Sequence, residues 1–416
     1  MVLSGNPTDR PCLLDFSNLI TKSLSLLECV NIVKGDTEWR TVETNKASAV
    51  QWLKENHIKS FYSVTRNTSF AQGGRSALEM SGLGKMQPNM MMIGFKNNWR
   101  TNLREAKEYY KVIQSAFDIH LAVGVLRISG GLDISMFCQS PIFDLDQSVS
   151  SVNSGLSDLR RLASMSIASQ TEPLWMIDEK PKRESSMFGC IGKRSEKVEE
   201  VLVDSSGREI SDRHYVDKMT VFRGDDEIEG FVDVYWLYDD GGLTLLLPHI
   251  LTTRKKFSKC KLRIFVLARE GKSVDEEKQN MTELLNKFRL SFHQIVMLTD
   301  VNKRPGKKIK KEFDEMIRPV LQPKKNAPSI EANTLMLTHS DLARTDENTK
   351  FHLRIAEIVR EHSSNASLIV MTLPMPTMDE SLPFGIYLSW LDLVSKNLPP
   401  FLMVRGNQES VLTFYS

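Results

Sequence analysis

The chain has 416 residues, more than one compact core usually holds, so we expect two domains or two halves. Hydrophobic residues make up 41% and charged residues 25% of it, a composition that excludes a collagen-like or wholly disordered protein. The formal net charge of +2, from 54 basic and 52 acidic residues, argues against a nucleic-acid-binding protein, because such proteins usually carry a basic excess.

The cysteines and the apolar runs restrict the compartment. The five cysteines are scattered, and their spacing fits neither a disulfide framework nor a zinc site, so we expect reduced thiols and no metal centre. No run approaches the roughly 18–20 apolar residues of a membrane span. The opening MVLSGNPTDRPCLLDF lacks the pattern of a signal peptide. We therefore expect the chain by itself to be soluble and cytosolic.

Residues 1–135 alternate short β-rich runs with longer helical stretches. Unbroken apolar runs such as NMMMIGF and HLAVGVLRI are typical of strands buried on both faces of a parallel sheet. Strands are expected at 12–16, 28–33, 59–65, 89–95 and 120–128, and helices at 41–56, 69–83 (with Gly84 as a cap) and 103–117. This alternation predicts a first α/β module with a mainly parallel sheet flanked by helices.

Residues 136–229 interrupt the pattern with serine-rich and charged sequence, which predicts a largely disordered insert. Within the insert, Arg160-Arg161 precede Ser164, and Lys182-Arg183 precede Ser185 and Ser186. Basic residues shortly before a serine suit kinases with an acidic pocket. These three serines are therefore the candidate phosphorylation sites, where a phosphate would add about two negative charges.

Residues 230–416 return to the alternation and predict a second α/β module. Strands are expected at 231–238, 261–268, 291–298, 368–373, 400–405 and 411–415, and helices at 243–253, 274–288, 308–317, 342–362 and 382–396. The two halves open alike, because DFSNLITK and DDGGLTLLLPHILTTRK each pass from an acid into a helix and then a cation. This echo indicates duplicated modules.

The sequence contains none of the common catalytic motifs, neither a P-loop, H-E-x-x-H, G-x-S-x-G nor a kinase H-R-D, so we expect no enzyme and no catalytic residue. Gly82-Leu83-Gly84 is better explained as a helix cap than as a dinucleotide motif. His249 fits a core or boundary histidine, and in His339-Ser340-Asp341 the serine or the aspartate fits a helix N-cap.

The turn Asp239-Asp240-Gly241-Gly242 is the strongest ligand candidate, because it joins an expected strand to an expected helix, where backbone amides attract anions. Its two acids oppose a phosphate, however. The competing interpretation is that Asp239 or Asp240 caps the helix while the glycines allow positive φ. Lys96, after the strand NMMMIGF, is a weaker candidate at the corresponding edge of the first sheet.

Several long segments carry a family resemblance. DVYWLYDDGGLTLLLPHILTTRKKFSKCKLRIFV, LPPFLMVRGNQESVLTFYS, RPCLLDFSNLITKSLSLLECVNI and FDIHLAVGVLRISGGLDIS are similar to the cytosolic C-terminal domain of cation–chloride cotransporters. The phrase DDGGLT and the ending FYS resemble the sodium-driven branch. The resemblance implies two modules similar to universal stress proteins, at the cytoplasmic face of the plasma membrane and attached to a membrane domain.

The same resemblance implies a regulatory domain that forms homodimers and is controlled by protein kinases and phosphatases. The run from Lys303 to Lys311 is interpreted as a solvated loop and helix start, or as a contact with anionic lipid headgroups. The alternative hypothesis is a nucleotide-binding sensor that holds ATP or ADP, as stress-protein-like folds can; otherwise no cofactor is expected. A hydrolase that uses Asp239 or Asp240 is the least favoured hypothesis.

Overall fold

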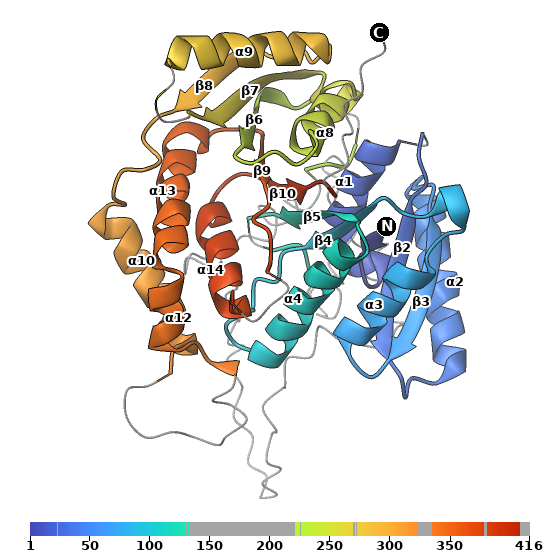
Figure 1. Ribbon diagram of the computed structural model, residues 1–416. Helices are drawn as coiled ribbons and strands as arrows, with labels where there is room; N and C mark the ends of the chain where they lie inside the picture. Colours follow the sequence, from blue (N-terminus) through green and yellow to red (C-terminus); the bar gives the residue numbers. More distant parts are fainter. Residues whose placement is uncertain are drawn as a thin grey trace, which may run out of the picture.

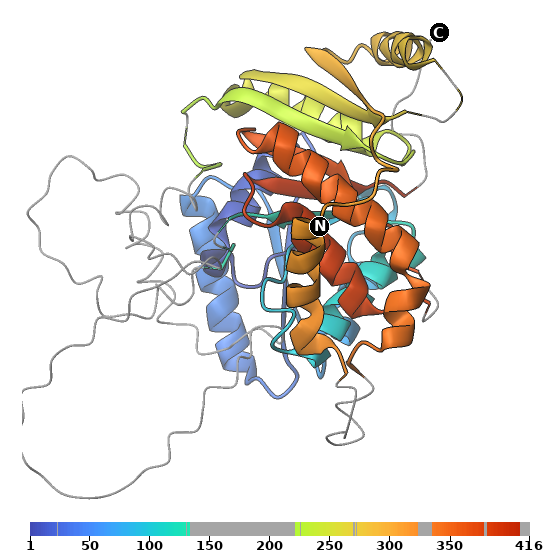
Figure 2. The same cartoon turned by 90° about the vertical axis from the view of Figure 1, so that its left-hand side faces the viewer.

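A computed structural model describes residues 1–133 except 23 and 130, 221–268 except 225, 271, 273–322, 335–377 and 381–407. These residues form an α/β protein in which ten strands make one continuous sheet with helices on both faces (Figures 1 and 2). The expected α/β class with a mostly parallel sheet is therefore confirmed. Outside the described residues lie the serines 164, 185 and 186 and the strand expected at 411–415.

The first half contributes five strands and four α-helices, most of them close to the expected ranges. The strands are β1 (Val2–Leu3), β2 (Glu28–Lys34), β3 (Phe61–Asn67), β4 (Met90–Gly94) and β5 (Ala122–Arg127), and the helices are α1 (Pro11–Thr21), α2 (Trp39–Glu55), α3 (Phe70–Met80) and α4 (Leu103–Asp118). Apolar residues at helical spacing explain α2, which buries Val42, Ala49, Trp52 and Leu53.

The second half repeats this arrangement with an additional pair of helices. The strands are β6 (Glu229–Trp236), β7 (Lys259–Leu267), β8 (Gln294–Leu298), β9 (Leu368–Thr372) and β10 (Phe401–Arg405), and the helices are α8 (Leu243–Thr252), α9 (Val274–Lys287), α10 (Lys307–Ile317), α12 (His339–Arg344), α13 (Asp346–Ser363) and α14 (Phe384–Ser395).

The strand order β3-β2-β1-β4-β5-β10-β9-β6-β7-β8 reads as the same five-strand pattern from either end. Within each half all neighbouring strands are parallel. The halves meet where β10 pairs antiparallel with β5, with Met403 opposite Val125. The two expected modules thus share one sheet. The echo between DFSNLITK and the DDGG segment corresponds to α1 and α8, each of which follows the first strand of its half.

The helices form two layers around this sheet. The core on one face joins side chains of α1, α2, α8 and α9 to the sheet, and the core on the other face joins those of α3, α4, α10, α13 and α14. Both layers run across the junction of the halves, since α1 contacts α8 and α4 contacts α14. Every strand of the middle of the sheet is therefore covered on both sides, as its apolar sequence requires.

Three expected elements are wrong. Residues 12–16 are not a strand but lie in α1, where Pro11 occupies the first helical position. The apolar residues Cys12, Leu13, Leu14 and Phe16 are all buried, so their spacing did not distinguish a helix from a strand. The strand of this region is the two-residue β1. The helix expected to reach residue 83 ends at Met80, and Gly84 does not cap it. The helix expected at 342–362 is two helices, α12 and α13, with Thr345 between them.

Candidate functional site

The turn at Asp239–Gly242 connects β6 to α8, and the carboxylate of Asp240 binds the start of that helix. Asp240 is buried, and its carboxylate accepts hydrogen bonds from the backbone N–H of Gly242 at 3.2 Å and of Thr244 at 3.0 Å. The Thr244 hydroxyl donates to it at 2.7 Å. Because the helix N-terminus attracts anions, this internal carboxylate occupies the position where a bound phosphate would lie.

The glycines of the turn are required by the backbone. Gly241 and Gly242 have φ of 75° and 90°, a region that favours glycine. Gly406, just after β10, lies so close that a Cβ placed on it would be 2.1 Å from the carbonyl oxygen of Asp240. Asp239 is exposed and accepts from the N–H of Gly241 at 3.1 Å. The turn is thus a closely packed joint with one buried and one exposed acid.

Lys96 lies at the carboxyl end of β4, as expected, but it is buried against Glu105. Its Nζ is 2.6 Å from Glu105 Oε2, and the other oxygen of Glu105 accepts from the Asn102 side chain at 2.7 Å. Since the two halves meet antiparallel, the carboxyl ends of β4 and β6 point to opposite edges of the sheet. The structure therefore does not bring Lys96 and the DDGG turn together.

A buried charged network joins the two halves, and the sequence analysis missed it. Arg127, the last residue of β5, lies 2.8 Å from the carboxylate of Asp392 in α14. Arg127 also donates to the Ser395 hydroxyl at 3.0 Å, and the indole N–H of Trp99 donates to Asp392 at 3.0 Å. Burial lowers the pKa of Arg127, and Asp392 opposes this shift. The signal in the sequence was a single charged residue in each of two apolar elements, the arginine of β5 and the aspartate of α14.

A second cluster lies at the start of α1. Arg10 is buried, donates to the carbonyl oxygen of Ser4 at 2.7 Å and pairs with Asp133 at 2.8 Å. Its neighbour Asp9 is also buried, and burial together with the Asp133 charge raises the pKa of Asp9 from 3.8 to about 7. In α1 itself, Asp15 pairs with Arg223 at 3.1 Å. Asp133 and Arg223 are thus held by Arg10, the residue before α1, and by Asp15 within it.

The remaining sequence candidates have structural roles. The N-cap of α12 is Thr338 rather than Ser340 or Asp341; Asp341 completes a capping box by accepting from the Thr338 N–H at 3.0 Å. His249 is half-buried on α8, and burial lowers its pKa. Lys303 pairs with Asp300 at 2.8 Å, and the N–H of Gly306 at the start of α10 donates to Glu357 at 2.8 Å.

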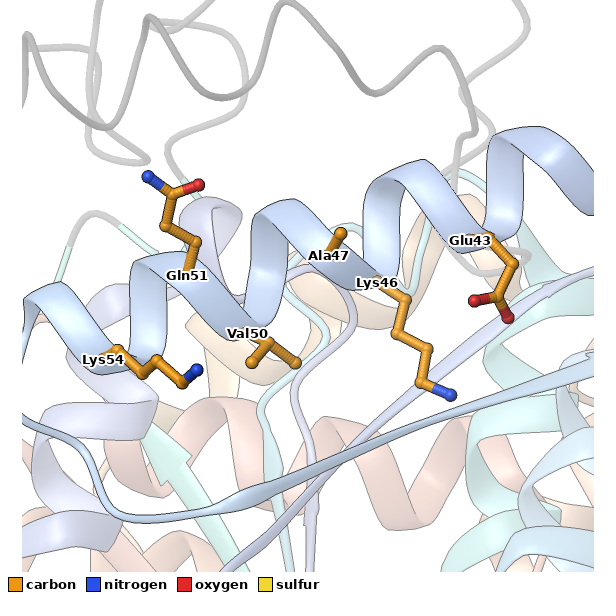
Figure 3. A pocket seen from close by; sticks show the side chains of 6 residues that line it. All are labelled: Glu43, Lys46, Ala47, Val50, Gln51 and Lys54. Atoms are coloured by element: carbon orange, nitrogen blue, oxygen red, sulfur yellow. The ribbon is translucent and has the colours of Figure 1, made fainter.

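A hollow of about 520 Å³ lies along α2 (Figure 3). The lining side chains in the described part of the chain come from that helix: Glu43, Lys46, Ala47, Val50, Gln51 and Lys54. Among the described residues, no group of three His, Cys, Asp or Glu side chains could hold a metal ion. No helix in the same part of the chain is long and apolar enough to cross a bilayer.

Comparison with known proteins identifies relatives. A family model described as Solute carrier family 12 matches residues 10–416. Solute carrier family 12 member 1 of Rattus norvegicus is 35% identical over 431 residues, covering 100% of this chain and 38% of that protein. The bumetanide-sensitive sodium-(potassium)-chloride cotransporter of Manduca sexta is 33% identical and is covered to 40% of its length. The chain thus spans about two-fifths of these relatives.

A solved structure gives a weaker likeness. The crystal structure of the cytoplasmic domain of a prokaryotic cation chloride cotransporter superposes with a TM-score of 0.43 at 8% sequence identity. The superposition covers 99% of this chain and 96% of that one.

Proposed function

This chain belongs to solute carrier family 12, which confirms the resemblance found in its segments, and we propose that it is the cytoplasmic regulatory and dimerisation domain of a sodium-driven cation–chloride cotransporter. The observation that carries the proposal is the extent of the similarity. All of this chain aligns with proteins named as members of that family, at 33–36% identity among the first relatives, but with less than half of their length. The ions would pass through the other part of such a protein, at the plasma membrane.

A chimera tests this proposal. The chain replaces the matching segment of the Manduca sexta cotransporter, and bumetanide-sensitive ion uptake is compared with that of a version lacking the segment. We expect the chimera to transport at a rate close to that of the intact cotransporter, at equal amounts at the cell surface. A chimera no more active than the deletion would contradict the proposal.

Control by kinases and phosphatases is the regulatory part of the proposal. The candidate sites Ser164, Ser185 and Ser186 follow basic residues, which suit a kinase with an acidic pocket. Mass spectrometry of the chimera from stimulated cells should find phosphate on at least one of them. Replacing all three by alanine should remove the change of ion uptake on stimulation and leave basal uptake in place. An unaltered response in that variant would contradict this regulatory role.

Homodimerisation is proposed from the same resemblance. Light scattering of the 47.4 kDa chain at tens of micromolar should give twice that mass. The interface of such a specific dimer should bury roughly 1,200 Å² or more in total. A strictly monomeric chain would refute dimerisation by this domain alone.

The exposed lysines of α10 are a further proposed contact, with anionic lipid headgroups. The variant Lys307→Ala/Lys308→Ala should then bind less strongly to vesicles that contain anionic lipids.

A nucleotide sensor is the second candidate function. The parallel strands of each half support it, because open α/β sheets bind ligands outside the carboxyl ends of their strands. The carboxylate of Asp240 opposes it at the DDGG turn, because ATP or ADP phosphates would meet a buried negative charge there. Calorimetry with ATP and ADP, with and without magnesium, separates the two functions. No heat at millimolar nucleotide would eliminate the sensor and leave the transporter domain intact.

A further inference from the structure

Exposed apolar side chains gather on one edge of the first half. Ten large hydrophobic residues of the described chain are exposed, and six of them belong to the segments that lead into the strands β2, β3 and β4. We call the edge at which these strands begin the amino edge. The six residues are Leu24, Leu26, Phe61, Met80, Leu83 and Met86.

The sheet topology brings these residues close to one another. The strands β3, β2, β1 and β4 are parallel neighbours, so all four begin at the same edge. With neighbouring strands about 4.8 Å apart, the four starting points lie within about 15 Å. The elements β2, β3 and α3 lie together on the side of the molecule away from α10 and α13 (Figure 1). The six residues therefore lie in or next to links at one edge of the sheet.

Tight turns hold the apolar side chains outward. Gly82 has φ of 75°, and a Cβ on it would lie 2.4 Å from the carbonyl oxygen of Met86, so the link between α3 and β4 is folded closely on itself. Leu83 is nevertheless 85% exposed and Met80 82% exposed. Lys22 and His57 also have positive φ in the links before β2 and β3. These links thus combine tightly turned backbone with exposed apolar side chains.

The links of the amino edge carry basic residues. The links 22–27, 56–60 and 81–89 contain three lysines and no acidic residue. Lys22 and Lys59 are exposed. Three acids border these links: Glu28, the first residue of β2, accepts from the Ser63 hydroxyl at 2.8 Å, Glu79 pairs with Arg75 at 2.8 Å, and Glu55 accepts from Gln51 at 3.0 Å. The edge is therefore apolar and cationic at once.

We propose that the amino edge of the first half docks on a bilayer that contains anionic lipids. Apolar side chains at the tips of links can enter the boundary between headgroups and acyl chains, while lysines beside them attract anionic headgroups. The proposal rests on the proposed function, since that function holds the chain beside a membrane. A second copy of the chain fits this edge less well, because a contact between copies would bury Lys22 and Lys59, and charged residues are depleted from the core of such interfaces.

The proposed surface differs from α10 in its composition. The lysines of α10 surround a helix whose apolar residues Ile309, Phe313, Met316 and Ile317 are buried in the core. That helix can attract headgroups by charge alone, whereas the amino edge adds exposed leucine, phenylalanine and methionine. Binding at the amino edge should therefore persist better at high salt, since screening weakens the electrostatic part only.

Vesicle sedimentation with the 416-residue chain tests the proposal. We expect binding to phosphatidylcholine vesicles that contain phosphatidylserine, and weaker binding to phosphatidylcholine alone. The variant Lys22→Ala/Lys59→Ala should weaken binding by about fivefold per lysine. The variant Leu24→Ser/Leu83→Ser/Met86→Ser should weaken it by about tenfold or more, and because these side chains are exposed it should fold normally.

Two controls lie elsewhere on the molecule. Trp39 is 59% exposed but follows β2 at the opposite edge, so Trp39→Ser should bind vesicles like the unchanged chain. Lys307→Ala/Lys308→Ala on α10 should lower binding less than the lysine variant of the amino edge. No binding to anionic vesicles, or an equal loss in Trp39→Ser, would overturn the proposal. So would a dimer that the triple variant converts into monomers, which would assign the edge to a second copy. Uptake by the chimera is independent of these results, so either hypothesis can fail alone.

Discussion

At the scale of single residues, Asp240 determines how the joint between β6 and α8 is held. Its buried carboxylate accepts from the backbone N–H groups of Gly242, Thr244 and Gly406 and from the Thr244 hydroxyl. In Asp240→Ala these donors lose their partner, which should lower the free energy of unfolding by about 2–4 kcal/mol. Urea denaturation measures this change.

The matched control for this change is the neighbouring acid. Asp239 is exposed and accepts one hydrogen bond from Gly241, so Asp239→Ala should cost less than about 1 kcal/mol. Equal losses in the two variants would show that the Asp240 carboxylate does not hold the helix start.

Asp9 predicts a pH dependence of stability. Its pKa is about 7 in the folded chain, against an ordinary value of 3.8. Between pH 4 and pH 7 the folded state therefore holds a proton that the unfolded state has lost, so the contribution of Asp9 to stability falls as pH rises. In Asp9→Asn this fall should be absent. Relative to the unchanged chain, the variant should gain roughly 3–4 kcal/mol between pH 4 and pH 8.

Unfolding free energies of both proteins at several pH values test this prediction, because titratable groups that do not interact with Asp9 contribute equally to both curves. Parallel curves for Asp9→Asn and the unchanged chain would mean that Asp9 ionises in the folded chain as it does in water.

At the scale of elements, two neighbouring glycines let α3 pack closely against β2 on one side and α4 on the other. A Cβ on Gly73 would lie 2.4 Å from Ile32 Cγ2 of β2, and a Cβ on Gly74 would lie 2.7 Å from Val112 Cγ2 of α4. Alanine favours helices by about 1 kcal/mol over glycine, but overpacking costs about 1–3 kcal/mol. We therefore expect Gly74→Ala to destabilise the chain by about 1 kcal/mol.

The neighbouring valine provides the control. Val112→Ala alone leaves a cavity and should destabilise the chain, while in the presence of Gly74→Ala the new methyl group fills part of that cavity. The double variant should thus be more stable than the sum of the single changes predicts, by denaturant unfolding. An additive result would mean that α3 and α4 separate easily at this contact.

Elements with a clear period could be predicted from the sequence, and those with special ends could not. Helix α4, with Tyr109, Ile113 and Ala116 on one buried stripe, lies within one residue of its expected range. In α1 the apolar run is buried on several sides, so no period separates helix from strand. The break at Thr345 lies where α12 ends, and the exact end of a helix depends on its backbone hydrogen bonds, which the composition does not predict.

At the scale of the whole molecule, the sequence predicted two α/β halves but not their junction. The strand β5 and the strand β10 are far apart in the chain, and nothing in VGVLR or FLMVR specifies that they pair. The antiparallel pairing also decides that the two ligand candidates, Lys96 and the DDGG turn, lie at opposite edges. Membership of the family was predictable because long segments resembled it, whereas the fold alone would have left it open.

The pair of Arg127 and Asp392 is the test of how strongly the halves are coupled. Both side chains are at least nine-tenths buried and 2.8 Å apart across the junction. Arg127→Met or Asp392→Leu leaves one buried charge without its partner, which should lower the free energy of unfolding by about 3–5 kcal/mol. In the double variant neither charge remains, so its loss should be smaller than the sum of the two by about 2 kcal/mol or more.

Denaturant unfolding of the four proteins measures this coupling as a double-mutant cycle. The exposed pair of Arg75 and Glu79 is the control, since such surface pairs contribute about 0–1 kcal/mol and their changes should simply add. Strict additivity at Arg127 and Asp392 as well would mean that the halves are held by apolar packing of α4, α14 and the shared sheet alone. A large coupling would instead identify this pair as a specific link, because it forms only when β5 and α14 are in register.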